Sequence, residues 1–305
     1  MVRSRRSFLA AAGASAATAA SVALAGCSTF GAGSDPVRVL AAGSLQRALD
    51  DGLRDAVDAP IAVEARGSAA AARLVADGTR HPDVLALADV ALFDRVLDDP
   101  WYASFATNAL AVATADTPGG RAVAAAAASD DGHWYDPVVA GDAALGRTDP
   151  DLDPLGYRTV FLLELLAARH DRPGLPNAVL ARDQIYPETA LLSGFETGAI
   201  DAAVVYESMA TDHGYDAVDL PVDVDLSDPE HADAYADASY ELPDGGVVRG
   251  SAVEYGATLR SPDDDTARDV FEALVGGDYL AGHGFETPGA FPRFTRDAPD
   301  ALTDR

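Results

Sequence analysis

The chain has 305 residues, with 49 acidic and 22 basic side chains and a formal net charge of −27. A hydrophobic content of 48% excludes a disordered acidic protein, because disorder requires low hydrophobicity as well as high charge. All the basic residues are arginines, and the acidic balance excludes a nucleic-acid-binding surface, which must be basic. The charge instead predicts a protein from a halophile. The excess carboxylates of a folded chain repel one another, and about 1 M salt screens that repulsion by shortening the Debye length to roughly 3 Å.

The first 27 residues are predicted to be an export signal. Arg5 and Arg6 precede an apolar stretch that runs to about Ala25, and paired arginines favour the twin-arginine route, which carries folded cargo. The run Leu24-Ala-Gly-Cys27 resembles a bacterial or archaeal lipobox, in which the cysteine takes a lipid. An uncleaved membrane anchor is the alternative. We expect a lipid on Cys27, a tether over residues 28–35, and a location on the outer face of the cytoplasmic membrane.

Alternating short apolar runs and helical patterns follow the tether. Such alternation predicts a parallel α/β sheet. Strands are expected at residues 37–42, 61–65 and 84–88, and helices at 45–57 and 69–76.

The second half of the chain continues the α/β pattern. It predicts two α/β lobes, of which the first resumes near Val253. Strands are expected at residues 108–115, 202–206 and 253–259, and helices at 157–170, 189–197 and 265–275.

Two Gly-Ser steps are the first candidate binding elements. Gly43-Ser44 and Gly67-Ser68 each join a predicted strand to a predicted helix. Unpaired N–H groups and the helix dipole at such a junction favour an anion, and the serine hydroxyl adds another donor. A simple capping role for Ser44 and Ser68 is the alternative.

A second candidate is the segment from Asp153 to Thr159. Asp153 is suited to cap the helix that follows, with Pro154 at its first position. Aspartates at 149, 151 and 153 also raise the idea of a calcium loop, but the glycine and terminal glutamate of the twelve-residue loop are missing. Arg158 either faces the cleft or serves in an ion pair.

These segments together resemble the archaeal molybdate/tungstate-binding proteins of ABC importers. The resemblance extends in order from about residue 37 to residue 288, and its most specific part is Asp153-Pro-Leu-Gly-Tyr-Arg-Thr159. The other matching segments are Ala42-Gly-Ser-Leu45, Gly67-Ser68, Asp83 to Asp89, Ser104 to Asn108, Pro187-Glu-Thr189, Gly198 to Asp201, Val205 to Ser208 and Glu254 to Thr258.

The resemblance implies an α/β, two-lobed type II periplasmic-binding-protein fold with a ligand cleft between the lobes. Lobe 1 would comprise residues 36–110 and 250–305, and lobe 2 residues 111–249. It implies a non-catalytic, monomeric receptor that delivers the oxyanion to a membrane permease and needs no cofactor.

The resemblance also implies the ligand-binding residues. The hydroxyls and amides of Ser44 and Ser68 would bind from lobe 1. Backbone amides near Leu155 and Glu188, with the hydroxyl of Tyr206, would bind from lobe 2, and Asp153 matches an aspartate that coordinates the molybdenum or tungsten itself.

One position departs from the family pattern. We place the family's second carboxylate just before Tyr206, where this chain has Val205. Strand alternation would put Glu207 roughly 6–7 Å further along, out of reach. Glu188 is the substitute candidate, so both tetrahedral binding and six-fold coordination stay open.

Two other functions are alternatives to a molybdate/tungstate receptor. A receptor for sulfate or another oxyanion would use the same donors. A secreted serine hydrolase would use Ser44 or Ser68 as nucleophile, but it needs a partnered histidine, and the chain has no Gly-x-Ser-x-Gly elbow.

Overall fold

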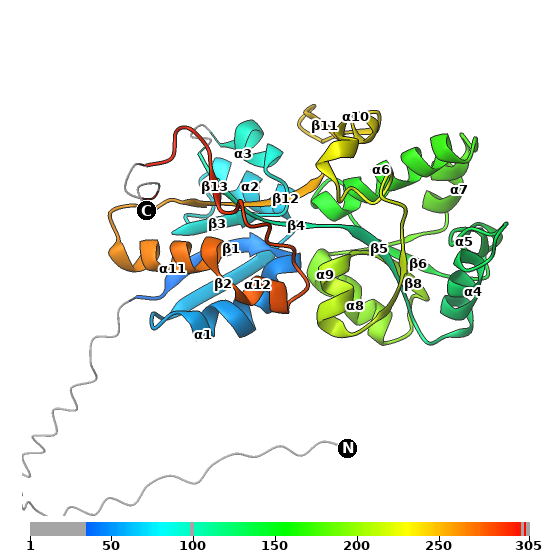
Figure 1. Ribbon diagram of the computed structural model, residues 1–305, viewed down its shortest axis with the longest axis horizontal. Coiled ribbons are helices and arrows are strands. Elements are labelled where there is room, and N and C mark those ends of the chain that lie inside the picture. The colour runs from blue at the N-terminus through cyan, green and yellow to red at the C-terminus, as the bar shows by residue number, and fades with distance from the viewer. Residues whose placement is uncertain (1–34, 98–100, 300–301, 303–305) are drawn as a thin grey trace, which may run out of the picture. The chain divides into compact units, whose positions relative to one another are not determined.

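The computed structural model describes residues 35–97, 101–299 and 302. The predicted export signal, Cys27 and most of the tether therefore lie outside the described residues. Residues 35–305 form one compact unit, built on two large β-sheets that define two lobes (Figure 1).

The sheet of lobe 1 has six strands. β1 pairs in parallel with β2 and β3, whereas β12 runs antiparallel between β3 and β4. The expected parallel pairing is confirmed for β1, β2 and β3, and the sheet is mixed because β12, from the later part of the chain, inserts antiparallel between β3 and β4. The spatial order is β13 (Arg293–Phe294), β4 (Ala103–Asn108), β12 (Val253–Leu259), β3 (Val84–Leu87), β1 (Val37–Ala42) and β2 (Ile61–Arg66).

Helices cover the sheet of lobe 1. α2 packs on β1 and β3, and α11 packs on β12 and β4. The helix expected over residues 45–57 is present as a continuous helical run from residue 43 to residue 56, in which η1, η2 and α1 differ in hydrogen-bond type and η2 has π-helical geometry. The helical elements are η1 (Gly43–Leu45), η2 (Ala48–Leu53), α1 (Arg54–Ala56), α2 (Ser68–Ala76), α3 (Ala91–Val96), α11 (Asp265–Gly276) and α12 (Tyr279–Gly282).

The sheet of lobe 2 has five strands. β6 pairs in parallel with β7 and β8, and β5 is antiparallel to β8 and β9. β6 was not expected from the sequence, because Leu145-Gly-Arg-Thr148 contains only one strongly apolar residue. The spatial order is β7 (Gln184–Tyr186), β6 (Leu145–Thr148), β8 (Ala202–Tyr206), β5 (Leu110–Thr114) and β9 (Asp216–Asp219).

The helices of lobe 2 include the longest helix among the described residues, α6. It packs on β6 and β8, while α8 packs on β6 and β7. The remaining elements are α4 (Pro118–Ala127), α5 (Asp136–Ala140), α6 (Pro154–Arg169), α7 (Leu175–Leu180), α8 (Glu188–Glu196), α9 (Glu207–His213), η3 (Pro229–His231), α10 (Ala232–Tyr235), and the hairpin of β10 (Ser239–Glu241) and β11 (Val247–Arg249).

Two chain segments connect the lobes. β4 leads almost directly into β5, whose first amide, that of Leu110, donates to the carbonyl of Asp225 at 2.8 Å. The chain returns into β12, where the amide of Val253 donates to the carbonyl of the neighbouring Leu226 at 2.8 Å. Asn108, at the end of β4, donates from Nδ2 to the Ser208 hydroxyl and accepts from the Ser208 amide. These bonds tie lobe 1 to the start of α9 in lobe 2 at the junction.

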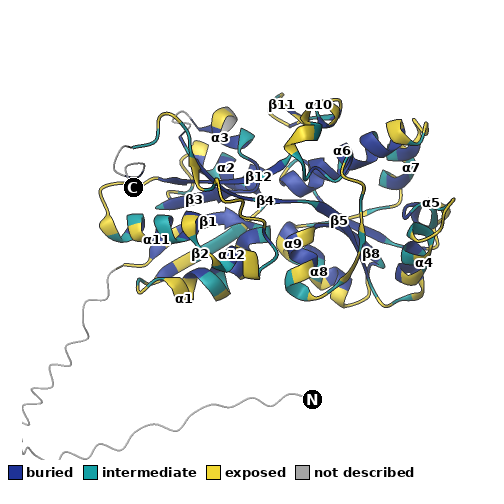
Figure 2. Ribbon diagram, viewed as in Figure 1, coloured by how far each residue is buried: buried dark blue, intermediate teal, exposed yellow. Residues whose placement is uncertain are grey.

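Burial follows the two sheets. Figure 2 shows buried residues along the strands and on the inner faces of the helices, with exposed residues on the outer faces. Within the described part of the chain, no helix is both long enough and apolar enough to cross a bilayer.

Candidate functional site

The candidate site lies where loops at the carboxyl ends of β1 and β2 meet lobe 2. Ligands of α/β proteins commonly bind at this edge of a sheet. Gly43 and Ser44 follow β1 in the turn η1, and Gly67 and Ser68 follow β2 and begin α2. The helix α8 of lobe 2 packs against both η1 and β2. The two Gly-Ser steps therefore lie together at the junction of the lobes.

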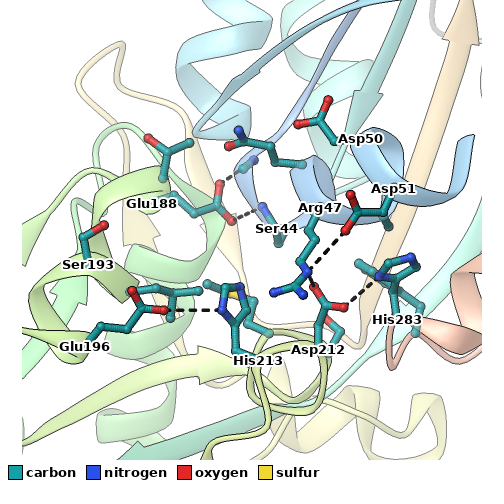
Figure 3. A pocket seen from close by; sticks show the side chains of 18 residues that line it. Ser44, Arg47, Asp50, Asp51, Glu188, Ser193, Glu196, Asp212, His213 and His283 are labelled. Atoms are coloured by element: carbon teal, nitrogen blue, oxygen red, sulfur yellow. Dashed lines mark hydrogen bonds and ion pairs between the residues drawn. The ribbon is translucent and has the colours of Figure 1, made fainter. Parts of the chain in front are cut away.

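Glu188 binds two backbone amides across this junction. Its Oε2 accepts from the amide of Gly43 at 2.7 Å, and its Oε1 accepts from the amide of Ser44 at 3.0 Å (Figure 3). The carboxylate thus binds the two amides that we expected to bind an oxyanion. This contact shows that the two amides are free to donate to an anionic group, which is the chemistry expected of a helix N-terminus.

Two glycines lie where the lobes approach each other closely. A Cβ on Gly43 would lie 2.5 Å from Oε2 of Glu188, and a Cβ on Gly67 would lie 2.5 Å from the carbonyl oxygen of Leu152. That carbonyl accepts from the amide of Ala70 in the first turn of α2, at 3.0 Å. A larger residue at Gly67 would push against backbone and hold the lobes apart, whereas at Gly43 it would displace the flexible Glu188 side chain from the two amides.

Asp153 caps α6, as the sequence predicts. Its Oδ1 accepts from the amide of Leu155 at 3.1 Å, and the residue is only 2% exposed. The Leu155 amide that was expected to bind the ligand is therefore engaged by Asp153 in this structure. The other oxygen, Oδ2, is buried and has no hydrogen-bond partner among the described residues.

Burial raises the pKa of both acidic groups, Asp153 and Glu188. Burial raises the pKa of Asp153 to about 6, against the opposing effects of the Thr148 hydroxyl and the Leu155 amide. Burial and the nearby Asp153 carboxylate raise the pKa of Glu188 well above its usual value. Asp153 and Glu188 therefore form an acidic pair of two buried carboxyl groups with raised pKa values, and such perturbed groups are typical of binding sites.

The three expected hydroxyls lie beside this pair. Ser44 Oγ accepts from the Tyr255 hydroxyl at 3.0 Å, and Ser68 Oγ accepts from the amide of Ala88 at 3.0 Å. Tyr206, at the end of β8, is fully buried and packs edge-on against Tyr255. The Asp153 and Glu188 carboxylates are close enough to raise the pKa of the Tyr206 phenol, after the larger effect of burial.

Arg158 reaches the same region from α6. Its Nη1 donates to the Tyr206 hydroxyl at 2.7 Å and to the carbonyl of Ala88 at 2.6 Å. Its Nη2 lies 3.6 Å from Oδ2 of Asp89, which also accepts from the Tyr157 hydroxyl at 2.5 Å. The sequence left Arg158 undecided and missed Asp89 and Tyr255, although all three belong to segments that carry the family resemblance.

The position before Tyr206 is not part of the site. Val205 is buried within β8 and pairs with Ala111 of β5. Glu207 begins α9 and lines a different cavity, together with Asn108 and Glu286. The second carboxyl group beside the Gly-Ser steps is that of Glu188, at the start of α8, which the sequence analysis named as the substitute candidate.

Two cavities flank Glu188. One, of about 350 Å³, is lined by Ser44, Arg47 and residues of α8 and α9. The other, of about 260 Å³, is lined by Gly67, Asp153 and residues near β7. Figure 3 shows the first cavity, where Arg47 of lobe 1 lies 3.3 Å from Asp212 of lobe 2.

The arrangement offers many donors and few metal ligands. Within the described ranges, no group of three or more His, Cys, Asp or Glu side chains could hold a metal ion by itself. Amides, hydroxyls and a helix N-terminus converge with two carboxyl groups, which suits a small oxyanion better than a bare cation.

Comparison with known proteins places the chain in a family. A family model described as bacterial extracellular solute-binding protein matches residues 37–273, which is most of the chain. The chain belongs to this solute-binding family. Its described fold, two lobes joined at a two-segment junction, is the arrangement that the sequence predicted for such a protein.

Named relatives are consistent with this family. A Haloferax volcanii protein is 52% identical over 97% of this chain and 96% of its own length, and it is described provisionally as an ABC transporter molybdenum-binding protein. The molybdate/tungstate-binding protein WtpA of Thermococcus kodakarensis is 27% identical over 70% of this chain and 68% of its own.

A solved structure supports the fold. The periplasmic molybdate-binding protein of Azotobacter vinelandii superposes with a TM-score of 0.52 over 83% of this chain and 99% of its own, at 13% identity. The expected type II binding-protein fold is confirmed.

Proposed function

We propose that this solute-binding protein captures molybdate or tungstate outside the cytoplasm and delivers it to the membrane permease of an ABC importer. The observation that carries the proposal is the pair of amides at Gly43 and Ser44, closed over by a buried carboxylate of the other lobe. The relatives described as binding molybdate or tungstate support it.

The donors fit a tetrahedral oxyanion. When the ligand binds, Glu188 releases the amides of Gly43 and Ser44, and these amides then donate to ligand oxygens. The hydroxyls of Ser44, Ser68 and Tyr206 complete the set of neutral donors. Neutral donors stabilise a buried dianion without the desolvation cost of a buried cation.

The carboxyl groups of Asp153 and Glu188 fit only certain oxyanions. Two unit charges 4 Å apart repel by about 4 kcal/mol at an effective dielectric constant of 20, so a carboxylate beside a dianion is unfavourable. The cost is offset if the carboxylate oxygens coordinate the high-valent metal atom, which accepts hard oxygen ligands. We therefore assign Asp153 and Glu188 as ligands of molybdenum or tungsten, which gives six-fold coordination and discriminates against sulfate and phosphate.

The decisive experiment is a calorimetric titration of the purified protein with tungstate, molybdate and sulfate in high salt. Calorimetry is preferable to tryptophan fluorescence, because Trp101 and Trp134 are buried in the lobes and neither lines the two cavities beside Glu188. We expect saturable binding of tungstate and molybdate and much weaker binding of sulfate. Binding of sulfate alone would favour the alternative receptor, and no binding at all would contradict the proposal.

The rest of the biology follows the sequence features. We propose twin-arginine export, processing before Cys27, and a lipid on that cysteine that keeps the receptor near its permease and raises its effective concentration there. We further propose that the receptor works as a monomer in a salt-rich medium, carries its ligand unchanged and needs neither a cofactor nor catalysis. Mass spectrometry of the membrane fraction, comparing the wild type with Cys27→Ser, tests the lipid anchor.

A further inference from the structure

The three hydroxyl groups at the site share a bonding pattern that the function proposed above does not explain. Each oxygen accepts a hydrogen bond from a donor of the protein: Ser44 from the Tyr255 hydroxyl, Ser68 from the Ala88 amide, and Tyr206 from Arg158. The last two directions are fixed, because an amide N–H and a guanidinium can only donate. A hydroxyl that accepts in this way still has its own hydrogen to give.

The hydrogen of Tyr206 is the clearest case. Among the described residues, no acceptor receives a hydrogen bond from its hydroxyl, although the side chain is fully buried. Burial raises the pKa of this phenol well above its usual value, so the hydrogen stays on the oxygen at any physiological pH. The Asp153 and Glu188 carboxylates are near enough to act on its charge. The hydroxyl is thus a donor, held next to the acidic pair where the oxyanion would bind.

Arg158 is well placed to fix this direction. Only 1% of it is exposed, and its Nη1 contacts two groups at once, the Tyr206 hydroxyl of lobe 2 and the Ala88 carbonyl of lobe 1. Ala88 is also the residue whose amide holds the Ser68 hydroxyl. Arg158 therefore binds the Tyr206 hydroxyl and also Ala88, the lobe-1 residue whose amide orients the Ser68 hydroxyl.

We propose that Arg158 is a positioning residue that turns Tyr206 into an obligatory hydrogen-bond donor toward the bound oxyanion when the lobes are closed. The inference rests on the proposed function, since it needs an oxyanion in the cleft. It differs from a purely structural role, in which the ion pair of Arg158 with Asp89 would stabilise the fold without acting on Tyr206. If Arg158 acts through Tyr206, the affinity losses caused by mutating the two residues should not multiply. If Arg158 is purely structural, they should.

The test is a double-mutant cycle on affinity. Wild type, Arg158→Lys, Tyr206→Phe and the double variant are titrated by calorimetry with tungstate, molybdate and sulfate in high salt. A hydrogen bond to a charged group corresponds to about a 10- to 100-fold change in affinity, so Tyr206→Phe should weaken binding by about that factor. Arg158→Lys should weaken it about 10-fold, because one ammonium replaces a planar fork with several donors. If Arg158 acts through Tyr206, the double variant should bind about as tightly as Tyr206→Phe alone.

The matched control is Arg147→Lys. Arg147 is the other arginine of lobe 2 that is buried in an ion pair, with Asp183, and it makes no hydrogen bond to Tyr206. The fold-loss of affinity caused by Arg147→Lys should multiply with the fold-loss caused by Tyr206→Phe, because the two residues act independently. If the fold-losses of affinity caused by Arg158→Lys and Tyr206→Phe also multiplied in the double variant, the inference would be overturned.

A folding failure does not leave the inference open. If circular dichroism shows that Arg158→Lys is unfolded, the cycle is repeated with Arg158→Gln combined with Asp89→Asn, which removes both buried charges together. Failure of the proposed function is separately visible: a wild type that binds only sulfate contradicts that function, while the cycle run with sulfate still decides the role of Arg158. A wild type that binds none of the three oxyanions overturns both.

Discussion

At the scale of single residues, Glu188 is the side chain whose position matters most. It extends from the first turn of α8 and accepts two amide hydrogen bonds from lobe 1, as an anion would. Its carboxylate therefore resembles the ligand in both charge and bonding. Together with Asp153 it gives the cleft an acidic pair that must either coordinate the ligand or move away from it.

The charge of Glu188 should set ligand selectivity. We expect Glu188→Gln to weaken tungstate binding, by about 10-fold or more, because an amide oxygen is a poorer ligand for a high-valent metal. Sulfate binding should be unchanged or tighter, because a repelling charge is removed. Titrations with tungstate and with sulfate give the ratio of the two affinities. The control is Glu196→Gln, which is exposed on the same helix. Equal loss for both anions would contradict metal coordination by Glu188.

Asp153 should make the stability of the protein depend on pH. Its folded pKa of about 6 lies above the usual 3.8, so the folded protein binds the proton more tightly than the unfolded chain does. Its contribution to stability is fully present below about pH 4 and is lost as pH rises through 6. A rise from 3.8 to about 6 corresponds to roughly 3 kcal/mol between the protonation states.

Urea denaturation in high salt checks this expectation. Between pH 4.5 and 8, Asp153→Asn should lose less unfolding free energy than the wild type, because the neutral amide does not titrate. Asp130→Asn, in an exposed turn, should follow the wild type. Identical pH profiles for the wild type and Asp153→Asn would refute a raised pKa at this position.

At the scale of elements, the start of α2 shows how closely the lobes fit. Gly67 has φ −57° and ψ 133°, angles that alanine adopts easily, so its need for glycine is one of space and not of backbone conformation. The carbonyl of Leu152 occupies the place of a Cβ, and it accepts from the Ala70 amide. A loop of lobe 2 is thus docked on the N-terminus of a lobe-1 helix.

Gly67→Ala should therefore act on closure and not on folding. The added methyl group would lie 2.5 Å from a backbone oxygen, which can move only if the lobes separate. We expect tungstate affinity to fall by about 10-fold or more, with a change in unfolding free energy of about 1 kcal/mol or less. Gly174→Ala, at the start of α7 with nothing within 4 Å of the added carbon, is the control. Unchanged affinity in Gly67→Ala would argue against closure over the ligand.

At the scale of the whole molecule, the net charge of −27 dominates. Many of the arginines form exposed ion pairs, such as Arg38 with Asp83 and Arg54 with Asp50. Exposed pairs of this kind contribute little each, so they do not offset the repulsion among the excess carboxylates. The molecule depends on its solvent for the remaining screening.

Stability should therefore rise steeply with salt. We expect the midpoint of thermal unfolding to increase between 0.2 and 2 M potassium chloride, where the Debye length falls from about 7 Å to about 2 Å. The experiment uses the ligand-free protein at constant pH, so that ligand binding and protonation do not change. A midpoint that is flat or falls with salt would contradict a halophilic adaptation.

The sequence by itself determined most of the local elements and supplied the candidate residues of the site. Strong apolar runs predicted β1, β8 and β12, and the Asp153-Pro154 pair predicted the start of α6, because a side-chain cap and a proline act within one turn of chain. The fold class followed from the alternation of strands and helices together with the family resemblance. Ser44 and Ser68 were named as candidates from residue types and order, whereas Tyr206 and the ligand role of Asp153 came from the family resemblance.

Only the tertiary structure decided which groups meet. The insertion of β12 between β3 and β4, the strand β6 and the contact of Glu188 with Gly43 all join residues far apart in sequence. The role of Arg158 likewise depends on Ala88 and Tyr206, which lie 70 and 48 positions away. Local pattern carries no information about such pairs, because the side chains that share a cleft are selected by how two lobes pack and not by their neighbours along the chain.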